Sequence, residues 1–124
     1  MTGARLKIRL AYQRGFQVVD GSTILNTFPT KEEAFQFLVD RDARVWLDWG
    51  RTVIGGRTAP FDYAASFLQE SVGRIRQEQH PPSAGIWLWS CFENGARGKT
   101  EIKDEAVFQV ERAFTRFVVK ADWR

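Results

Sequence analysis

A step of Lys, an acid, Glu and Ala occurs twice in the chain, at residues 31–34 and 103–106, 72 residues apart. Acids in a first turn stabilise the positive end of the helix dipole, and a small Ala lets a helix approach a sheet closely. Each step follows a strand-like segment. We therefore predict two helices, each closing a sheet-plus-helix module, and an internal repeat.

The residues before the first step predict three strands. In residues 5–12, basic side chains alternate with apolar ones, which is typical of a half-buried strand. Asp20-Gly21 tolerates positive φ and predicts a hairpin turn. The second and third strands are then expected at 16–19 and 23–28.

The first helix is expected to start at a capping box. Thr30 precedes the step, and Glu33 lies three residues later, which is a helix-start pattern. Apolar residues at helical spacing then predict a helix over 31–44. Residues 45–49 fit either an extension of this helix or the start of a strand.

The second half is less regular. Residues 50–60 contain Gly55-Gly56 and predict a linker or a long hairpin loop. Residues 61–78 fit a helical stripe, but alternation around Gly73 favours a strand over 71–77. We also predict a strand over 86–92, apolar on both faces and therefore central or covered on both sides, and a helix over 104–120.

These elements predict an α+β protein made of two consecutive small antiparallel βββα-like modules. The first module is expected over residues 1–49 and the second over 61–124, joined by residues 50–60. Five Trp and ten Phe residues supply apolar surface, so we expect the modules to pack into one compact unit around shared aromatic side chains.

The first half resembles the arm-type DNA-binding domain at the amino end of tyrosine integrases, and also uncharacterised bacterial repeat domains. The resemblance to the integrase domains rests on the motif Phe-x-Thr-Lys-x-Glu-Ala, present here at residues 28–34. In those domains an open sheet face enters the major groove of DNA. No recombinase catalytic domain is included in the resemblance, so it does not imply integrase activity.

The second half is similar to small bacterial proteins of unknown function. Three short motifs carry the resemblance: Gly-Arg-Ile at 73–75, Gly-x-Trp-x-Trp at 85–89 and Glu-Ala at 105–106. This resemblance, more than the periodicity, favours a strand over 71–77. It implies no activity.

Composition argues against several classes of function. The net charge is +3, and the only cysteine and the only histidine are Cys91 and His80. Cys91 lies in an apolar strand, where a thiol is usually an inert small hydrophobe, and no acidic cluster has metal-loop spacing. We therefore expect no enzyme, no metal and no cofactor. Short apolar runs and the lack of a signal peptide predict a cytoplasmic protein without a membrane partner.

One candidate site is the basic face of the first strand. Cations that alternate along a strand lie about 7 Å apart, which is comparable to the spacing of phosphates along a nucleic acid. Gln17 and Thr27 would reach base edges if they share that face. The alternative is a solvated edge strand whose charges prevent aggregation. The candidate nucleic-acid-binding residues are Arg5, Lys7, Arg9, Arg14 and Gln17.

A second candidate is an aromatic and cationic platform made of Arg74, Arg76, Trp87 and Trp89. Such a platform would hold bases or a peptide. The alternative, which we favour, is that both indoles fill the core between the modules, with Ile86 and Leu88 under the helix, because large aromatic side chains are more often buried than displayed.

We expect a small non-catalytic binding protein. The aromatic surplus favours a protein partner or a homodimer, as in an accessory or inhibitor protein of a phage or mobile element. The alternative is a nucleic-acid-binding protein that uses the basic face of the first sheet. Binding of labelled nucleic acid at low salt would discriminate between the two.

Overall fold

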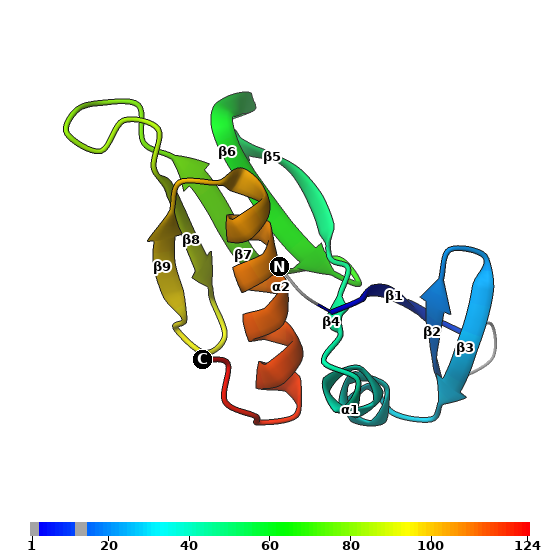
Figure 1. Cartoon of the computed structure of the whole chain (residues 1–124). Coiled ribbons are helices and arrows are strands. Elements are labelled where there is room, and N and C mark those ends of the chain that lie inside the picture. The colour runs from blue at the N-terminus through cyan, green and yellow to red at the C-terminus, as the bar shows by residue number, and fades with distance from the viewer. Residues whose placement is uncertain (1–2, 12–14) are drawn as a thin grey trace. The chain divides into compact units, whose positions relative to one another are not determined.

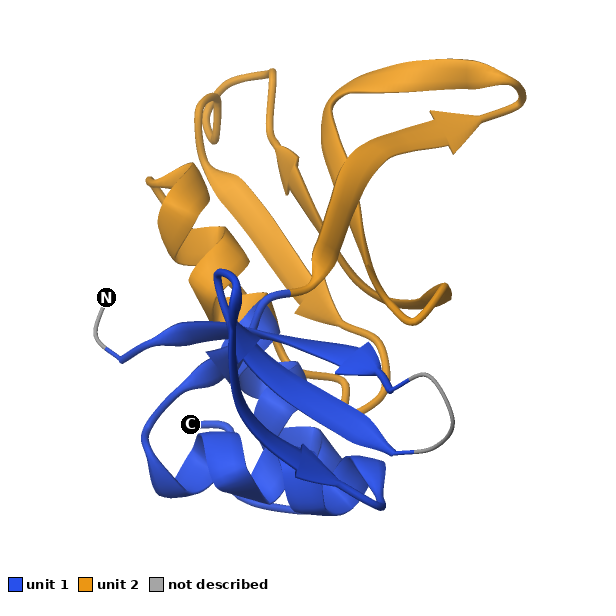
Figure 2. Ribbon diagram, turned by 90° about the vertical axis from the view of Figure 1, so that its right-hand side faces the viewer, with its two compact units in different colours: residues 1–46, 111–124 blue, residues 47–110 orange. Residues whose placement is uncertain are grey.

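The computed structural model describes residues 3–11 and 15–124, and within them it has a four-stranded sheet, a five-stranded sheet and two helices (Figure 1). The predicted α+β class is confirmed. The chain forms two compact units, residues 1–46 with 111–124 and residues 47–110 (Figure 2). The boundary therefore falls inside the second helix, α2 (Lys103–Val118), which contributes residues to both units.

The first unit contains a four-stranded sheet with the order β3-β2-β1-β4. Its antiparallel meander confirms the three predicted strands, and β4 pairs parallel to β1. The hairpin after β2 turns at Gly21, whose φ is +61°, as the Asp-Gly pattern predicts. The elements of this unit are β1 (Arg5–Leu10), β2 (Phe16–Asp20), β3 (Thr23–Phe28), α1 (Lys31–Asp40) and β4 (Arg44–Val45).

Helix α1 starts where the sequence predicts and stops four residues early. The Thr30 hydroxyl accepts a hydrogen bond from the Glu33 N–H at 3.2 Å, which is the predicted N-cap. At the other end Asp42 adopts φ +52°, and the Ala43 N–H donates to the Leu38 carbonyl at 2.8 Å. This is a Schellman ending. It occurs without glycine, so the sequence carries no signal for it.

The second unit contains one antiparallel sheet with the order β5-β6-β7-β8-β9. Residues 50–60 are not a linker: they form parts of β5 and β6 and the Gly55-Gly56 turn between them. The strand predicted at 71–77 is confirmed as β7. The strand predicted at 86–92 is β8, which is an interior strand beside the edge strand β9 and has one buried and one half-buried face. The strands are β5 (Asp48–Ile54), β6 (Arg57–Phe67), β7 (Glu70–Gln77), β8 (Trp87–Cys91) and β9 (Arg97–Thr100).

The first half of α2 lies closely against one face of this sheet. A Cβ added at Gly73 would lie 2.6 Å from Val110 Cγ1 and 2.8 Å from the Ser90 carbonyl oxygen. The glycine is therefore needed for a close approach of helix and strand. On the same face Trp87 and Trp89 are only 8% and 7% exposed, so both indoles are buried as favoured. The accompanying prediction that Leu88 lies under the helix is wrong, because successive strand residues alternate between faces and Leu88 lies on the opposite, half-buried face.

The buried stripe of α2 follows the predicted spacing. Of the apolar residues at helical spacing, Ala106, Val110, Ala113 and Phe114 are buried. The others are half-buried: Val107, Phe117 and Ala121. Two polar side chains on the same helix, Glu111 and Thr115, are also buried, which the sequence pattern does not predict.

The predicted module boundaries differ from the compact units. Three consecutive antiparallel strands do precede each helix, but the second meander is extended by the β5–β6 hairpin. Residues 111–124, expected in the second module, belong to the first unit. The reason is that α2 is 16 residues long, so its two halves can serve different cores. The internal repeat stays a prediction.

Candidate nucleic-acid interface

The basic strand β1 carries its cations on the face opposite the buried Leu6 and Ile8. The register aligns Arg9 with Gln17, and Gln17 with Thr27, so these three side chains lie in one row across the sheet, as expected. The Arg9 Nε donates to the Gln17 Oε1 at 2.8 Å. Arg14, the remaining predicted residue of this surface, lies outside the described residues.

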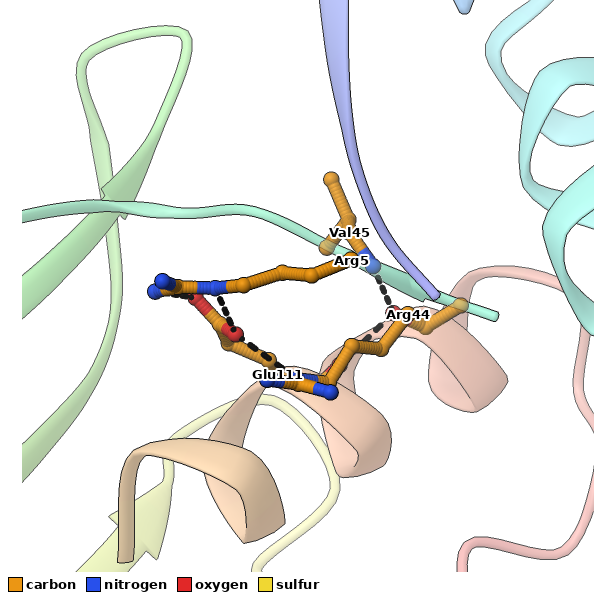
Figure 3. A network of polar contacts seen from close by, with 5 residues as sticks. Arg5, Arg44, Val45 and Glu111 are labelled. Carbon is orange, nitrogen blue, oxygen red and sulfur yellow. Dashed lines mark hydrogen bonds and ion pairs between the residues drawn. The ribbon is translucent and has the colours of Figure 1, made fainter. Parts of the chain in front are cut away.

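Arg5 is engaged in a network inside the first unit (Figure 3). Its Nε and Nη2 donate to the two carboxylate oxygens of Glu111, both at 2.7 Å, and the Arg44 Nε donates to Glu111 Oε1 at 3.0 Å. The Val45 N–H donates to the Thr115 hydroxyl at 2.9 Å, which further ties β4 to α2. Arg5 is therefore a structural residue and contributes little to a ligand surface.

Two cations of β1, Arg5 and Lys7, lie close to an exposed indole. Trp46 is 45% exposed, and its ring centroid lies 4.3 Å from the Arg5 guanidinium carbon and 5.5 Å from the Lys7 Nζ. Cation–π contacts of this kind hold both side chains near the ring. The first strand is thus a weaker candidate for phosphate binding than its sequence suggests.

The predicted platform of two arginines and two tryptophans does not exist as one surface. The register aligns Ile75 with Trp89, and it aligns the arginines with Leu88 and Ser90. Side chains of successive strand residues point to opposite faces. Trp87 and Trp89 therefore lie on the helix-covered face, and Arg74 and Arg76 lie on the other one.

That other face gathers four cations from two strands. One cross-strand row runs Arg76, Leu88, Lys99, and the next runs Arg74, Ser90, Arg97. Together the rows line a shallow groove of about 500 Å³, to which Trp89 and Gly98 also contribute atoms. We call this set the cationic face: Arg74, Arg76, Arg97 and Lys99 around Leu88 and Ser90.

The two β7 arginines have acidic partners. Arg74 forms a bidentate pair with the buried Asp62, which also accepts from the Thr52 hydroxyl at 2.7 Å. The hydrogen bond from Arg74 holds the pKa of Asp62 below its usual range, and the same bond raises the pKa of Arg74. Arg76 Nη2 lies 3.6 Å from a Glu78 carboxylate oxygen.

The β9 cations carry the unbalanced charge of this face. Both are exposed, and among residues 3–11 and 15–124 neither Arg97 nor Lys99 has an acidic partner within 4 Å. Sequence reasoning missed these two residues. The signal was present, because Arg97-Gly98-Lys99 repeats the alternation of the basic first strand.

The Cys91 thiol is poorly placed to act as a nucleophile. Cys91 is 1% exposed, and burial raises the pKa of its thiol, which disfavours the reactive thiolate. His80 lies exposed in the segment between β7 and β8. Within the described part of the chain, no three His, Cys, Asp or Glu side chains are grouped so that they could hold a metal ion.

Comparison of the chain with protein-family models, with curated proteins and with solved structures finds no match. The resemblances to integrase and bacterial domains therefore stay predictions. None of the helices in the described residues combines the length and the apolar character that crossing a bilayer requires.

Proposed function

We propose that the chain is a non-catalytic binding protein and that its ligand is a nucleic acid held by the cationic face. One observation carries the proposal: four cations surround Leu88 and Ser90 on the face of the five-stranded sheet opposite α2. This moves the predicted nucleic-acid surface from the first sheet to the second.

The charge balance of the cationic face supports an anionic ligand. Asp62 neutralises part of the charge of Arg74, and Glu78 lies near Arg76, but Arg97 and Lys99 add two positive charges that the face itself does not balance. A phosphate backbone supplies repeated negative charges, and releasing its counterions drives binding. Because this term depends on salt, it gives the proposal a direct test.

The test is a titration of a fluorescein-labelled 20-nucleotide strand and of its duplex, followed by anisotropy at about 50 to 200 mM salt. We expect binding at low salt that weakens as salt rises. The variant R97A/K99A should bind more weakly. The control R51A/R57A removes the same charge from the β5–β6 hairpin and should bind like wild type. Failure of the wild type to bind either form at low salt would overturn the proposal.

A second candidate function is binding of a protein partner, a second copy of the chain included. The observation that favours it is the β5–β6 hairpin, which extends beyond the rest of the sheet (Figure 1). Val53, Ile54 and Phe61 on this hairpin are 63%, 60% and 47% exposed. Successive strand residues point to opposite faces, so Val53 and Ile54 place exposed apolar surface on both faces of the hairpin, where a protein partner could cover it. Sedimentation of wild type and V53S/I54S over a range of concentrations tests self-association, and identical monomeric behaviour at all concentrations would argue against a homodimer.

A further inference from the structure

The geometry of the cationic face points to a single-stranded ligand, with two consecutive phosphates each held between one β7 arginine and one β9 cation. This inference rests on the proposed function and specifies its ligand. The two pairs are Arg76 with Lys99 and Arg74 with Arg97, which lie on either side of β8.

Spacing along the strands fits successive phosphates. Arg74 and Arg76 are two residues apart on β7, and Arg97 and Lys99 are two residues apart on β9. Two residues of a strand span about 7 Å. That is comparable to the distance between neighbouring phosphates of an extended nucleic-acid strand, so one pair of cations can serve each phosphate.

Spacing across the strands leaves room for one backbone. The members of each pair are separated by two strand spacings, about 9.6 Å at about 4.8 Å each. Leu88 and Ser90 form the floor between them, and both are half-buried. The Ser90 hydroxyl can donate to a phosphate oxygen, while the Leu88 side chain offers apolar contact to a sugar or a base.

The width of the sheet argues against a duplex. A sheet that enters the major groove must fit a width of about 12 Å, which admits a two-stranded ribbon. Here β7 and β8 are interior strands of a five-stranded sheet. Four strand spacings of about 4.8 Å make this sheet about 19 Å wide, so the cationic face cannot enter the groove. A single strand lies on the face without that restriction.

The number of neutralised phosphates sets how steeply the binding constant should fall with salt. For single strands the logarithm of the binding constant falls with log salt at about 0.7 per neutralised phosphate charge. Two phosphates are neutralised, so wild type should show a slope of about −1.4, which is roughly a sevenfold loss between 50 and 200 mM salt. R97A/K99A removes the two cations that no acid of the face balances, so its slope should approach zero.

The experiment measures this slope by anisotropy for labelled 20-nucleotide oligo(dT) and oligo(U) and for a 20-base-pair duplex. We expect either single strand to bind more tightly than the duplex. R97A/K99A should bring the slope close to zero, while R51A/R57A leaves it unchanged. Circular dichroism of each variant verifies that it is folded.

The outcomes separate the inference from the function on which it rests. Equal or tighter binding of the duplex would overturn the single-strand inference and leave nucleic-acid binding intact. Absence of binding to all three probes at 50 mM salt would overturn both. Binding by wild type with an unchanged slope in R97A/K99A would remove the cationic face as the site.

Discussion

Glu111 is a buried carboxylate that two arginines share, and replacing it with Gln tests how much this network stabilises the first unit. The side chain of Glu111 is fully buried, and it receives hydrogen bonds from Arg5 at 2.7 Å and Arg44 at 3.0 Å. Gln keeps the shape but loses the charge, and its amide nitrogen is a donor that faces other donors. Both guanidinium groups would then lack their counter-charge.

The expected loss of stability in E111Q follows from the burial of the Arg5 and Arg44 side chains. Removing one member of a buried ion pair costs about 3–5 kcal/mol when the remaining charge stays dry. The side chains of Arg5 and Arg44 are 27% and 14% exposed, so water can partly rehydrate them. We therefore expect the lower end, about 3 kcal/mol, for E111Q. For a chain of this size the melting temperature should fall by roughly 10–15 °C.

Urea unfolding followed by far-UV circular dichroism measures the free energy of unfolding of wild type and E111Q. The control E101Q changes an exposed acid and should stay within about 0.5 kcal/mol of wild type. A loss below about 1 kcal/mol in E111Q would refute the reasoning, because it would mean that the two arginines do not depend on the carboxylate.

Three further outcomes are expected. The bond from Arg74 lowers the pKa of Asp62 below 3.8, so the carboxylate contributes stability that is present above about pH 4 and is lost as the pH falls through the lower folded-state pKa. D62N should thus be less stable than wild type at pH 6 and closer to it near pH 2–3 in urea titrations, and an equal gap at both pH values would contradict this. G73A should lower the free energy of unfolding by about 1–3 kcal/mol, because its Cβ would collide with Val110 and with backbone; an unchanged thermal melt would show that the helix is not held that close. The Cys91 thiol should resist Ellman's reagent at pH 8 in the native protein and react once urea unfolds it, whereas rapid native labelling would speak against its burial.

Local sequence patterns predicted the elements whose causes lie in neighbouring residues. The alternation in β1, the glycine turn after β2 and the Thr30 cap each depend on contacts within a few positions, and all are present. The early end of α1 was missed because Asp42 adopts a left-handed conformation that glycine usually signals. The strand β6 was missed because apolar residues at helical spacing also occur there by chance.

Only half of the cations of the cationic face were identified from the sequence. Arg74 and Arg76 were identified, but they were grouped with Trp87 and Trp89. These tryptophans lie on the neighbouring strand, but their side chains point to the opposite face of the sheet. The register between strands decides to which face of the sheet each side chain points. Register depends on long-range pairing that a single sequence does not specify.

By itself, the sequence determined an α+β chain with two helix starts, a basic first strand and a Trp-rich strand in the second half. The tertiary structure alone decided three things: that residues 111–124 join the first unit, that Glu111 is buried between Arg5 and Arg44, and that the β9 cations complete the cationic face. The physical reason is separation along the chain. Arg5 and Glu111 are 106 positions apart, and no local propensity links residues at that distance.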